Sequence, residues 1–578
     1  MKMLYQSSRL TERGSALALT MIMTGVALAI LASTMTWSAH STRMNYRNVQ
    51  YHRSVAAAEA ATEKVMSQVT RDYLIGGDKQ VTDNLANYRM IVPTGADSSY
   101  WNDWEFNDVT TAGRTFVQVG TATNYVLANS AYAGLRAFAT TYRVAAHARL
   151  TDTIEEVVGG VLQEVHLARI PIFQFALYSS ADMEISCGQP FTITGRVHSN
   201  GKLYVEPDAK FLTFQSDVTA MKEVLFQRHP LDTRGPPSGG VVYQKDPETP
   251  VPALTLPIGT TNSPEAIRQI IQPPPVGESA DSPLGRLRYI NQSELIIVVT
   301  NGGVTITSGK FNNFATTVPT NEVAAMVVLT NSFTDARESK VVKPVDLNVG
   351  ALTEWSRTNS NVRKALGSND VASVYVWDRR TLPATQLSAV RVFNGRALPT
   401  RGLTVATARP LYVLGHYNQT NNLYLAKNDT TTTRPASLVG DAITVLSTAW
   451  KDANSTIAVE SRGAAPTTIN AAFLTGVVET TKGKYSGGME NFPRFLETWG
   501  AANAFTYNGS MVKMFPSLYA TNAWGTSGVR APPKRDWAYD LNFSDPNKLP
   551  PLTPSLLTVI RGQWATLAPT RNFASALR

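Results

Sequence analysis

SALALTMIMTGVALAILASTMTW, residues Ser15 to Trp37, is the stretch that decides the architecture of this 578-residue chain. Its 23 residues carry no charged side chain, and Glu12-Arg13-Gly14 comes directly before it. A helix rises about 1.5 Å per residue, so this stretch reaches about 35 Å and can cross a hydrocarbon core of about 30 Å. The sequence therefore predicts a membrane-spanning helix.

The helix is expected to continue beyond the membrane. From Ser38 to Leu74 there is neither proline nor glycine, and the segment VAAAEAA, residues Val55 to Ala61, is rich in the strongest helix former. Small and apolar residues recur at steps of three and four, which places them on one helical face: Val55, Ala58, Thr62, Val65, Val69 and Tyr73. We expect this face to dock on a globular head and the helix to end at Gly76-Gly77.

The N-terminal residues also resemble a known family. RLTERGSALALTMIM, beginning at Arg9, and QYHRSVAAAEAATEKV, beginning at Gln50, are similar to the N-terminal module of PilX-type minor type IV pilins and pseudopilins. That resemblance covers residues 9 to 70. Three later segments resemble the long heads of PilX-like bacterial envelope proteins: GRVHSNGKLYV (Gly195 to Val205), SFTDARESK (Ser332 to Lys340) and YSGGMENFPRFLETW (Tyr485 to Trp499).

The resemblance implies cleavage by a prepilin peptidase after Gly14, which makes Ser15 the first mature residue and Ser15 to Trp37 the span. It implies membrane lipid, other pilin-like subunits and the prepilin peptidase as partners. It also implies a single-pass protein of the bacterial cytoplasmic membrane, with its head outside the cytoplasm and with entry into a surface filament left open. Major pilins carry glutamate at the fifth mature position, where this chain has Leu19. This departure favours a priming, assembly or tip role in a type IV pilus or type II secretion filament over a repeating subunit.

Two other interpretations of the N-terminus stay open. A secretory signal peptide would use Lys2, Arg9 and Arg13 as its basic region, but the small-residue sequence Ala27-Leu28-Ala29 lies inside the apolar run and not at its end. A plain uncleaved anchor differs from a pilin chiefly in whether Gly14 is processed.

The composition is that of a folded protein. Charged residues make up 17% of the chain and hydrophobic residues 43%, which is enough apolar material for a sizeable core. The net charge of +9 is spread along the sequence without a basic run of five or more, so no nucleic-acid partner is expected. Cys187 is the only cysteine, so no intramolecular disulfide can form. It lies in a strand-like stretch without an adjacent basic residue and is expected to be a buried core residue.

The predicted fold class is α+β, with a long N-terminal transmembrane helix followed by a β-rich head. Alternating runs at Tyr142 to Thr151 and Val157 to Ile170 predict adjacent strands or a hairpin. Many short Val- and Thr-rich runs after Phe173 suit a parallel β-solenoid or a sandwich, and we favour a solenoid although no fixed period emerges. The predicted division is a leader (1–14), a transmembrane and extended helix (15–75), an α+β pilin-like region (76–180) and a β-rich head (181–578) with a proline-rich surface insertion (234–285).

No catalytic or metal-binding motif occurs. The sequence has no phosphate loop, no Gly-x-Ser-x-Gly elbow and no His-Glu-x-x-His pair, so we expect no enzyme activity, no cofactor and no metal. His198 and Ser199 are neighbours and would point to opposite faces of a strand, so structural roles are expected for His198 and, in a turn, for His416. Asp346 to Gly350 resembles only a fragment of a calcium loop.

Aromatic residues of the last quarter either fill the core or form a sugar or partner platform: Trp499, Tyr507, Tyr519, Trp524, Trp537 and Tyr539. Two alternatives to a pilin-like protein therefore stay open. One is an anchored cell-envelope adhesin. The other is an anchored polysaccharide-acting β-solenoid enzyme, which needs two carboxylates about 5 to 10 Å apart in an open groove.

Overall fold

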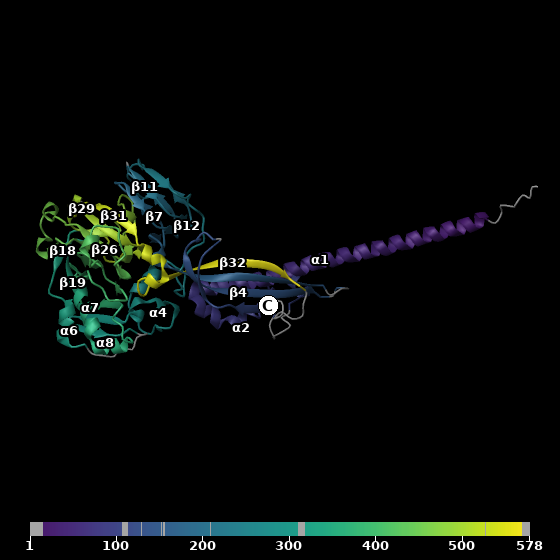
Figure 1. Cartoon of the computed structure of the whole chain (residues 1–578), viewed down its shortest axis with the longest axis horizontal. Helices are drawn as coiled ribbons and strands as arrows, with labels where there is room; N and C mark the ends of the chain where they lie inside the picture. The colour runs from purple at the N-terminus through teal and green to yellow at the C-terminus, as the bar shows by residue number, and fades with distance from the viewer. Residues whose placement is uncertain are drawn as a thin grey trace, which may run out of the picture.

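The computed structural model describes residues 15–106, 114–128, 130–151, 153, 157–208, 210–309, 318–525 and 528–568. A long helix projects from a β-rich body (Figure 1). The predicted α+β class, with an apolar N-terminal helix and a large β-rich region, is confirmed at this level.

Helix α1 (Ser15–Asp83) forms the projecting rod. Its continuity follows from the alanine-rich sequence without internal proline. Gly77 interrupts the helical backbone with φ 70° and ψ −164°, a conformation that glycine adopts without steric cost. The predicted stop at Gly76-Gly77 is therefore a kink, after which helical backbone continues to Asp83 and is followed by α2 (Leu85–Tyr88).

The last part of α1 lies on an antiparallel sheet. Its two long strands are β4 (Arg136–Leu150) and β5 (Val158–Pro171), which pair as the predicted hairpin, with Tyr142 opposite Val165. Beyond β4 lie β1 (Trp104–Phe106), β2 (Phe116–Val119) and β3 (Thr123–Val126). On the other side β5 pairs antiparallel with β32 (Ser555–Leu567), the last strand of the chain that the structure describes.

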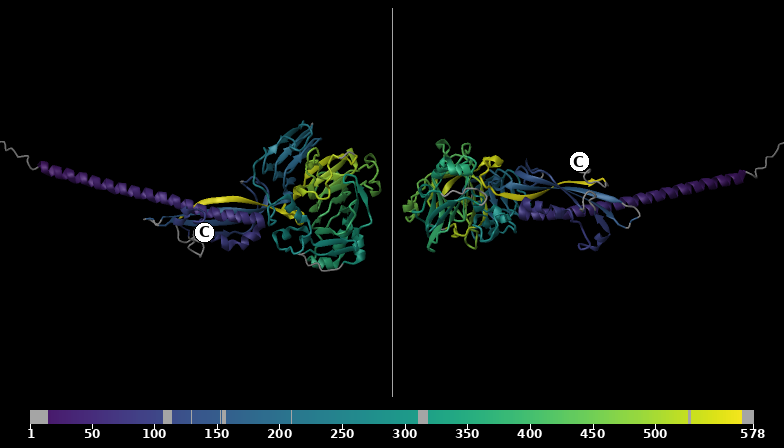
Figure 2. Two further views of the ribbon diagram at one scale, coloured as in Figure 1. Left: turned by 180° about the vertical axis from the view of Figure 1, so that it is seen from behind. Right: turned by 90° about the horizontal axis from the view of Figure 1, so that it is seen from below.

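Strand β32 places the head between two strands of one sheet. The chain leaves this sheet after Pro171 and returns at Ser555, so β32 runs beside β5 although most of the head's sequence separates them (Figures 1 and 2). This differs from the predicted division, which assigned all of residues 181–578 to the head. The alternation of apolar and polar residues along a strand does not indicate which other strand pairs with it, so the sequence pattern did not reveal the pairing of β32 with β5.

The first part of the head consists of short strands that return to the same three sheets. In each sheet, neighbouring strands pair in parallel and in register, with Leu177 opposite Val197 as one example. The three series are β6 (Leu177–Ser179), β9 (Val197–Ser199) and β12 (Val218–Ala220); β7 (Met183–Ile185), β10 (Leu203–Val205) and β13 (Val224–Leu225); β8 (Phe191–Ile193), β11 (Phe211–Phe214) and β14 (Gly240–Tyr243).

The second part of the head extends the first of these sheets from its other edge. Strand β30 (Met511–Pro516) pairs in parallel with β6, so Met511 lies opposite Leu177. The sheet then continues through β27 (Ala472–Val477), β24 (Ala436–Gly440), β22 (Leu403–Thr407), β20 (Ser373–Asp378), β15 (Leu295–Thr300) and β16 (Gly303–Thr307). All of these pairings are parallel except that of β15 with β16.

Two more sheets complete the head. One contains β17 (Val327–Val328), β18 (Phe333–Asp335), β19 (Lys340–Asn348), β21 (Gln386–Phe393), β23 (Leu411–Leu414), β25 (Ile443–Leu446) and β28 (Arg494–Phe495). The other contains β26 (Thr467–Asn470), β29 (Thr498–Gly509) and β31 (Ala531–Tyr539). Helices α6 (Thr320–Met326), α7 (Val349–Thr358) and α8 (Ser360–Ala365) lie together at one end of the body (Figure 1). Inward-facing valines, leucines and isoleucines of these strands form one large core.

The predicted insertion 234–285 is partly structured. It contains β14, helices α3 (Pro264–Arg268) and α4 (Pro283–Leu287), with a further short helix α5 (Tyr289–Gln292) after it. Ser263 caps α3, because its Oγ accepts a hydrogen bond from the Ala266 amide at 3.2 Å and Pro264 is the first helical residue. Ile267, Ile270 and Ile271 are buried, so this segment belongs to the core and not to a surface loop alone.

Candidate functional site

The first half of α1 is a candidate membrane segment. From Ser15 to Val49 no side chain is buried. The large apolar side chains of this part are exposed, with Leu17 71% and Trp37 74% exposed. In the described part of the chain this is the one helix that is long and apolar enough to cross a membrane. Ser15 is its first residue, whereas Gly14 and the rest of the predicted leader 1–14 lie outside the described residues. A run of exposed apolar side chains of this length marks a surface that lipid or other helices cover.

The second half of α1 is held tightly on the sheet. The predicted docking face is confirmed, because five of its six residues are fully buried: Ala58, Thr62, Val65, Val69 and Tyr73. The sixth, Val55, is partly buried. Small side chains let the two backbones approach closely. At Gly159 on β5, a side-chain Cβ would lie only 2.5 Å from the Val55 nitrogen.

Polar contacts fix the helix at this position. Ser54 Oγ donates to the Val157 carbonyl at 3.0 Å, and Gln163 Nε2 donates to Thr62 Oγ1 at 3.0 Å. On the outer side, Arg561 of β32 forms two hydrogen bonds to the Glu63 carboxylate, at 2.6 and 2.9 Å. The returning strand is therefore bonded both to the sheet and to the rod.

Three buried glutamates form a second candidate site in the head. Glu184 lies on β7, Glu206 follows β10 directly, and Glu490 lies in the short helix Met489–Asn491. Tyr485 interacts electrostatically with all three carboxyls. Glu184 accepts hydrogen bonds from Thr480 Oγ1 at 2.8 and 2.9 Å.

The protonation of these glutamates is shifted by their surroundings. Burial raises the pKa of each carboxyl, that of Glu206 to about 8 and that of Glu490 to about 7. The neighbouring Glu184 charge raises the pKa of Glu206 further, whereas Arg234 and Arg228 oppose the increase. Arg228 Nη1 lies 3.4 Å from Glu206 Oε2, and the Arg234 guanidinium lies 3.8 Å from the centre of the Tyr485 ring.

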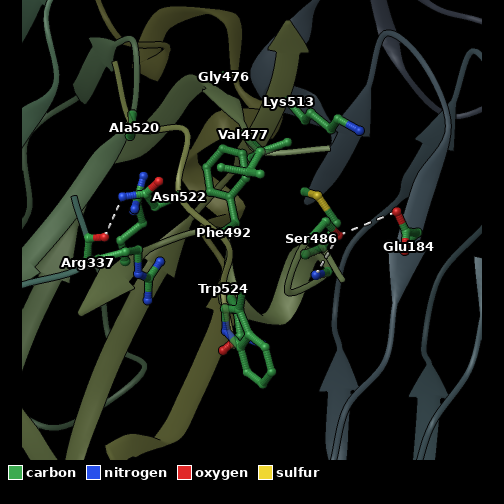
Figure 3. Close-up of a pocket in the computed structure, with 16 residues that line it drawn as sticks. Glu184, Arg337, Gly476, Val477, Ser486, Phe492, Lys513, Ala520, Asn522 and Trp524 are labelled. Carbon is green, nitrogen blue, oxygen red and sulfur yellow. Dashed lines mark hydrogen bonds between the residues drawn. The ribbon is translucent and has the colours of Figure 1, made fainter. Parts of the chain in front are cut away.

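A small pocket of about 40 Å³ lies beside the glutamates (Figure 3). Glu184 and Ser486 lie on one side of it and Arg337 and Asn522 on the other. Lys513 also lines the pocket, and its ammonium donates to the Asp182 carbonyl at 2.9 Å. Burial lowers the pKa of Lys513.

The sequence did not reveal these polar residues. They come from β7, the residue after β10, the turn after β18, the 480–491 segment, the middle of β30 and the segment after it, and their spacing matches no motif. Among the described residues, no group of three or more His, Cys, Asp or Glu side chains is arranged to hold a metal ion.

The histidines singled out in the sequence have the predicted structural roles. His198 is fully buried, with Nδ1 2.9 Å from Thr219 Oγ1 and Nε2 3.0 Å from Asn200 Oδ1. Burial lowers its pKa to about 4. Ser199 Oγ donates to the Ala181 carbonyl at 2.9 Å, so it forms no nucleophile pair with His198. His416 Nδ1 accepts a hydrogen bond from the Thr468 amide at 3.0 Å and thereby joins its turn to β26.

The remaining candidates lie in the core or at its margin. Cys187 is buried as predicted, and burial raises the pKa of its thiol to about 12. The carboxylate of Asp346, in the fragment that resembles a calcium loop, instead accepts hydrogen bonds from Arg391 at 2.6 and 2.8 Å. Of the late aromatic residues, Trp499 and Tyr507 are core side chains. The others are partly buried: Tyr519, Trp524, Trp537 and Tyr539.

No family model matches the chain, and no curated protein matches it. Among solved structures, the chain is similar to the competence-associated pilin ComZ from Thermus thermophilus. The two share 11% sequence identity over 89% of this chain and 97% of that chain, with a TM-score of 0.28.

Proposed function

We propose that this chain is a non-enzymatic, membrane-anchored pilin-like protein that contributes to the assembly, priming or tip of a type IV pilus or type II secretion filament. The observation that carries the proposal is the division of α1 into two halves. Its apolar half from Ser15 is wholly exposed, and its second half is docked on a sheet. A soluble protein would not leave such a surface uncovered.

Other features support this interpretation. The rod and the four-strand path β1, β4, β5 and β32 form one module, in which the helix supports the sheet. Leu19 in place of an acidic residue favours a subunit used in few copies. The family resemblance adds cleavage after Gly14 by a prepilin peptidase, the PilX type, and a head displayed outside the cytoplasmic membrane.

We interpret the head as a parallel β-solenoid with insertions. The in-register parallel pairing of β6 with β9 and of β9 with β12 supports this interpretation, as does the same order in the two neighbouring sheets. In this interpretation the head is an exposed scaffold whose loops offer a surface to partners. An adhesin shares these features and differs only in its partner, so recovery of glycans in place of pilin-like subunits on affinity capture would favour it.

N-terminal sequencing of the protein isolated from membranes tests the proposal most directly. We expect the mature chain to begin at Ser15. A start at Met1 would indicate a plain anchor, and a start within or after the apolar run, near Ile30 or Ser38, would indicate a secreted protein. Either result would contradict the proposed processing.

A further inference from the structure

Arg337 is a buried cation with guanidinium nitrogen atoms that form no hydrogen bond. It lies in the turn after β18, is only 5% exposed and lines the same pocket as Glu184. Its Nε and Nη2 atoms are buried and form no hydrogen bond. Buried polar groups in native proteins nearly always form hydrogen bonds, so two guanidinium nitrogen atoms without an acceptor require an explanation.

The acids near Arg337 are occupied by other donors. Asp335 Oδ1 accepts hydrogen bonds from the amides of Arg337 and Glu338, at 2.8 and 3.1 Å, and Asp335 Oδ2 accepts one from Tyr412 at 2.7 Å. Glu338 accepts hydrogen bonds from the Arg494 side chain and from the amides of Thr521 and Asn522. Neither carboxylate therefore forms a hydrogen bond with the Arg337 guanidinium.

Other positive charges surround the same position. Arg494 lines the pocket, is 7% exposed and has a buried Nη1 without a hydrogen-bond partner. Arg530, with its guanidinium 4.8 Å from the Trp524 ring centre, also repels Arg337. The buried Trp524 Nε1 has no acceptor either. Burial and these two arginines lower the pKa of Arg337 well below its usual range, although the charges of Asp335 and Glu338 oppose this decrease. The group thus holds four buried nitrogen atoms that have no hydrogen-bond acceptor.

We propose that Arg337, Arg494 and Trp524 form a binding site for a small oxyanion such as sulfate, phosphate or a carboxylate. The donors without acceptors belong to residues that line one pocket, and a guanidinium group can donate two parallel hydrogen bonds to two oxygens of a carboxylate, phosphate or sulfate. The pocket volume of about 40 Å³ exceeds the roughly 10 to 15 Å³ that one water requires. Glu184, the one carboxylate that lines the pocket, lies on its opposite side and is bonded to Thr480, so it does not occupy the arginine side (Figure 3).

Binding is tested on the full-length protein in detergent. We expect sodium sulfate to raise the melting temperature saturably relative to sodium chloride at matched ionic strength, because an anion that binds the folded state stabilises it by mass action. Isothermal titration with sulfate should give one site per chain. The same measurements with phosphate and with acetate show whether the site prefers a tetrahedral anion or a planar carboxylate. An increase that is linear in every salt, or no binding by the wild-type chain, would overturn the proposal.

Variants locate the site. Arg337→Gln is expected to weaken sulfate binding at least 10-fold, and Lys482→Gln, which removes an exposed positive charge, should leave it unchanged. If Arg337→Gln does not fold, Trp524→Phe removes only the indole donor and is expected to weaken binding about 3-fold. Wild-type sulfate affinity in both Trp524→Phe and Arg494→Gln would place the anion elsewhere and contradict the assignment.

Discussion

The Ile172 amide donates a hydrogen bond to the Pro554 carbonyl at 2.9 Å. These two residues mark the points where the chain leaves the rod-bound sheet and where it returns, so the whole head is held at its base between β5 and β32. The nearby Thr255 amide and carbonyl both bond to Leu557, which ties the insertion to the same base. The last described strand is therefore part of the module that contains the helix, and changes in it should affect the rod.

Leu557→Ala is expected to destabilise the chain by about 2 to 5 kcal/mol, because Leu557 is 1% exposed and packs with Val65 and Tyr73 of α1. Trp564→Ala on the same strand is the matched control, since Trp564 is 49% exposed and should cost about 0.5 kcal/mol or less. Urea unfolding followed by circular dichroism measures both. Equal losses in the two variants would show that β32 does not stabilise the rod.

Gly159→Ala is expected to push α1 from the sheet. The new Cβ would lie 2.5 Å from the Val55 nitrogen and 2.7 Å from the Ser54 carbonyl carbon, and backbone atoms cannot move aside easily. We expect a cost of about 1 to 3 kcal/mol and faster proteolysis of the helix. Gly188→Ala provides the control, because nothing lies within 4 Å of its Cβ position. Equal stability of the two variants would contradict the close approach.

Local sequence patterns predicted the helix and the first strand pair because their signals are short-range. The docking face from Ala58 to Tyr73 repeats every three to four residues, and the hairpin partners are near one another in sequence. The opposite directions of His198 and Ser199 likewise depend only on their strand β9. Cys187 is buried as predicted, although it lies in the loop between β7 and β8 and not in a strand.

The rest of the fold depends on contacts that no local pattern encodes. The pairing of β6 with β30 joins segments from the two ends of the head, and insertions of unequal length between strands remove any fixed period. The polar cluster is equally non-local, because Glu184 meets Thr480, and Arg494 meets Glu338. Arg337 was not identified as a candidate because its importance lies in the absence of a partner, which only the three-dimensional arrangement reveals.

Val26→Arg is expected to impair membrane insertion. Val26 is 50% exposed in the apolar half of α1, and an arginine near the centre of a span costs about 2.5 to 3.5 kcal/mol on translocon scales. Carbonate extraction of membranes measures the fraction that stays inserted, with Val26→Leu as the control. If the arginine variant still required detergent for its release as the wild type does, the assignment of Ser15 to Trp37 as the span would be wrong.

The free energy of unfolding is expected to fall as the pH rises from 6.5 to 8.5. The folded-state pKa of Glu206 is about 8, above its unfolded value of 4.5, so the folded state binds more protons than the unfolded state between these values. This stabilisation is complete below pH 4.5 and is lost as the pH rises through 8. For Glu206 alone the loss from pH 6.5 to 8.5 is about 2 kcal/mol. Glu490, with a pKa of about 7, acts in the same direction.

Glu206→Gln should reduce this pH dependence, because glutamine occupies the same place without a titratable proton. His198 has the opposite sign, since its folded-state pKa of about 4 lies below its usual 6.5. Most of its effect falls below pH 6.5, and the remainder is the same in every chain compared. Glu354→Gln, on the exposed face of α7, is the control and should keep the wild-type slope. Urea unfolding at pH 6.5 and 8.5 measures all three chains. An unchanged difference in Glu206→Gln would mean that Glu206 is already ionised in the folded protein at pH 6.5.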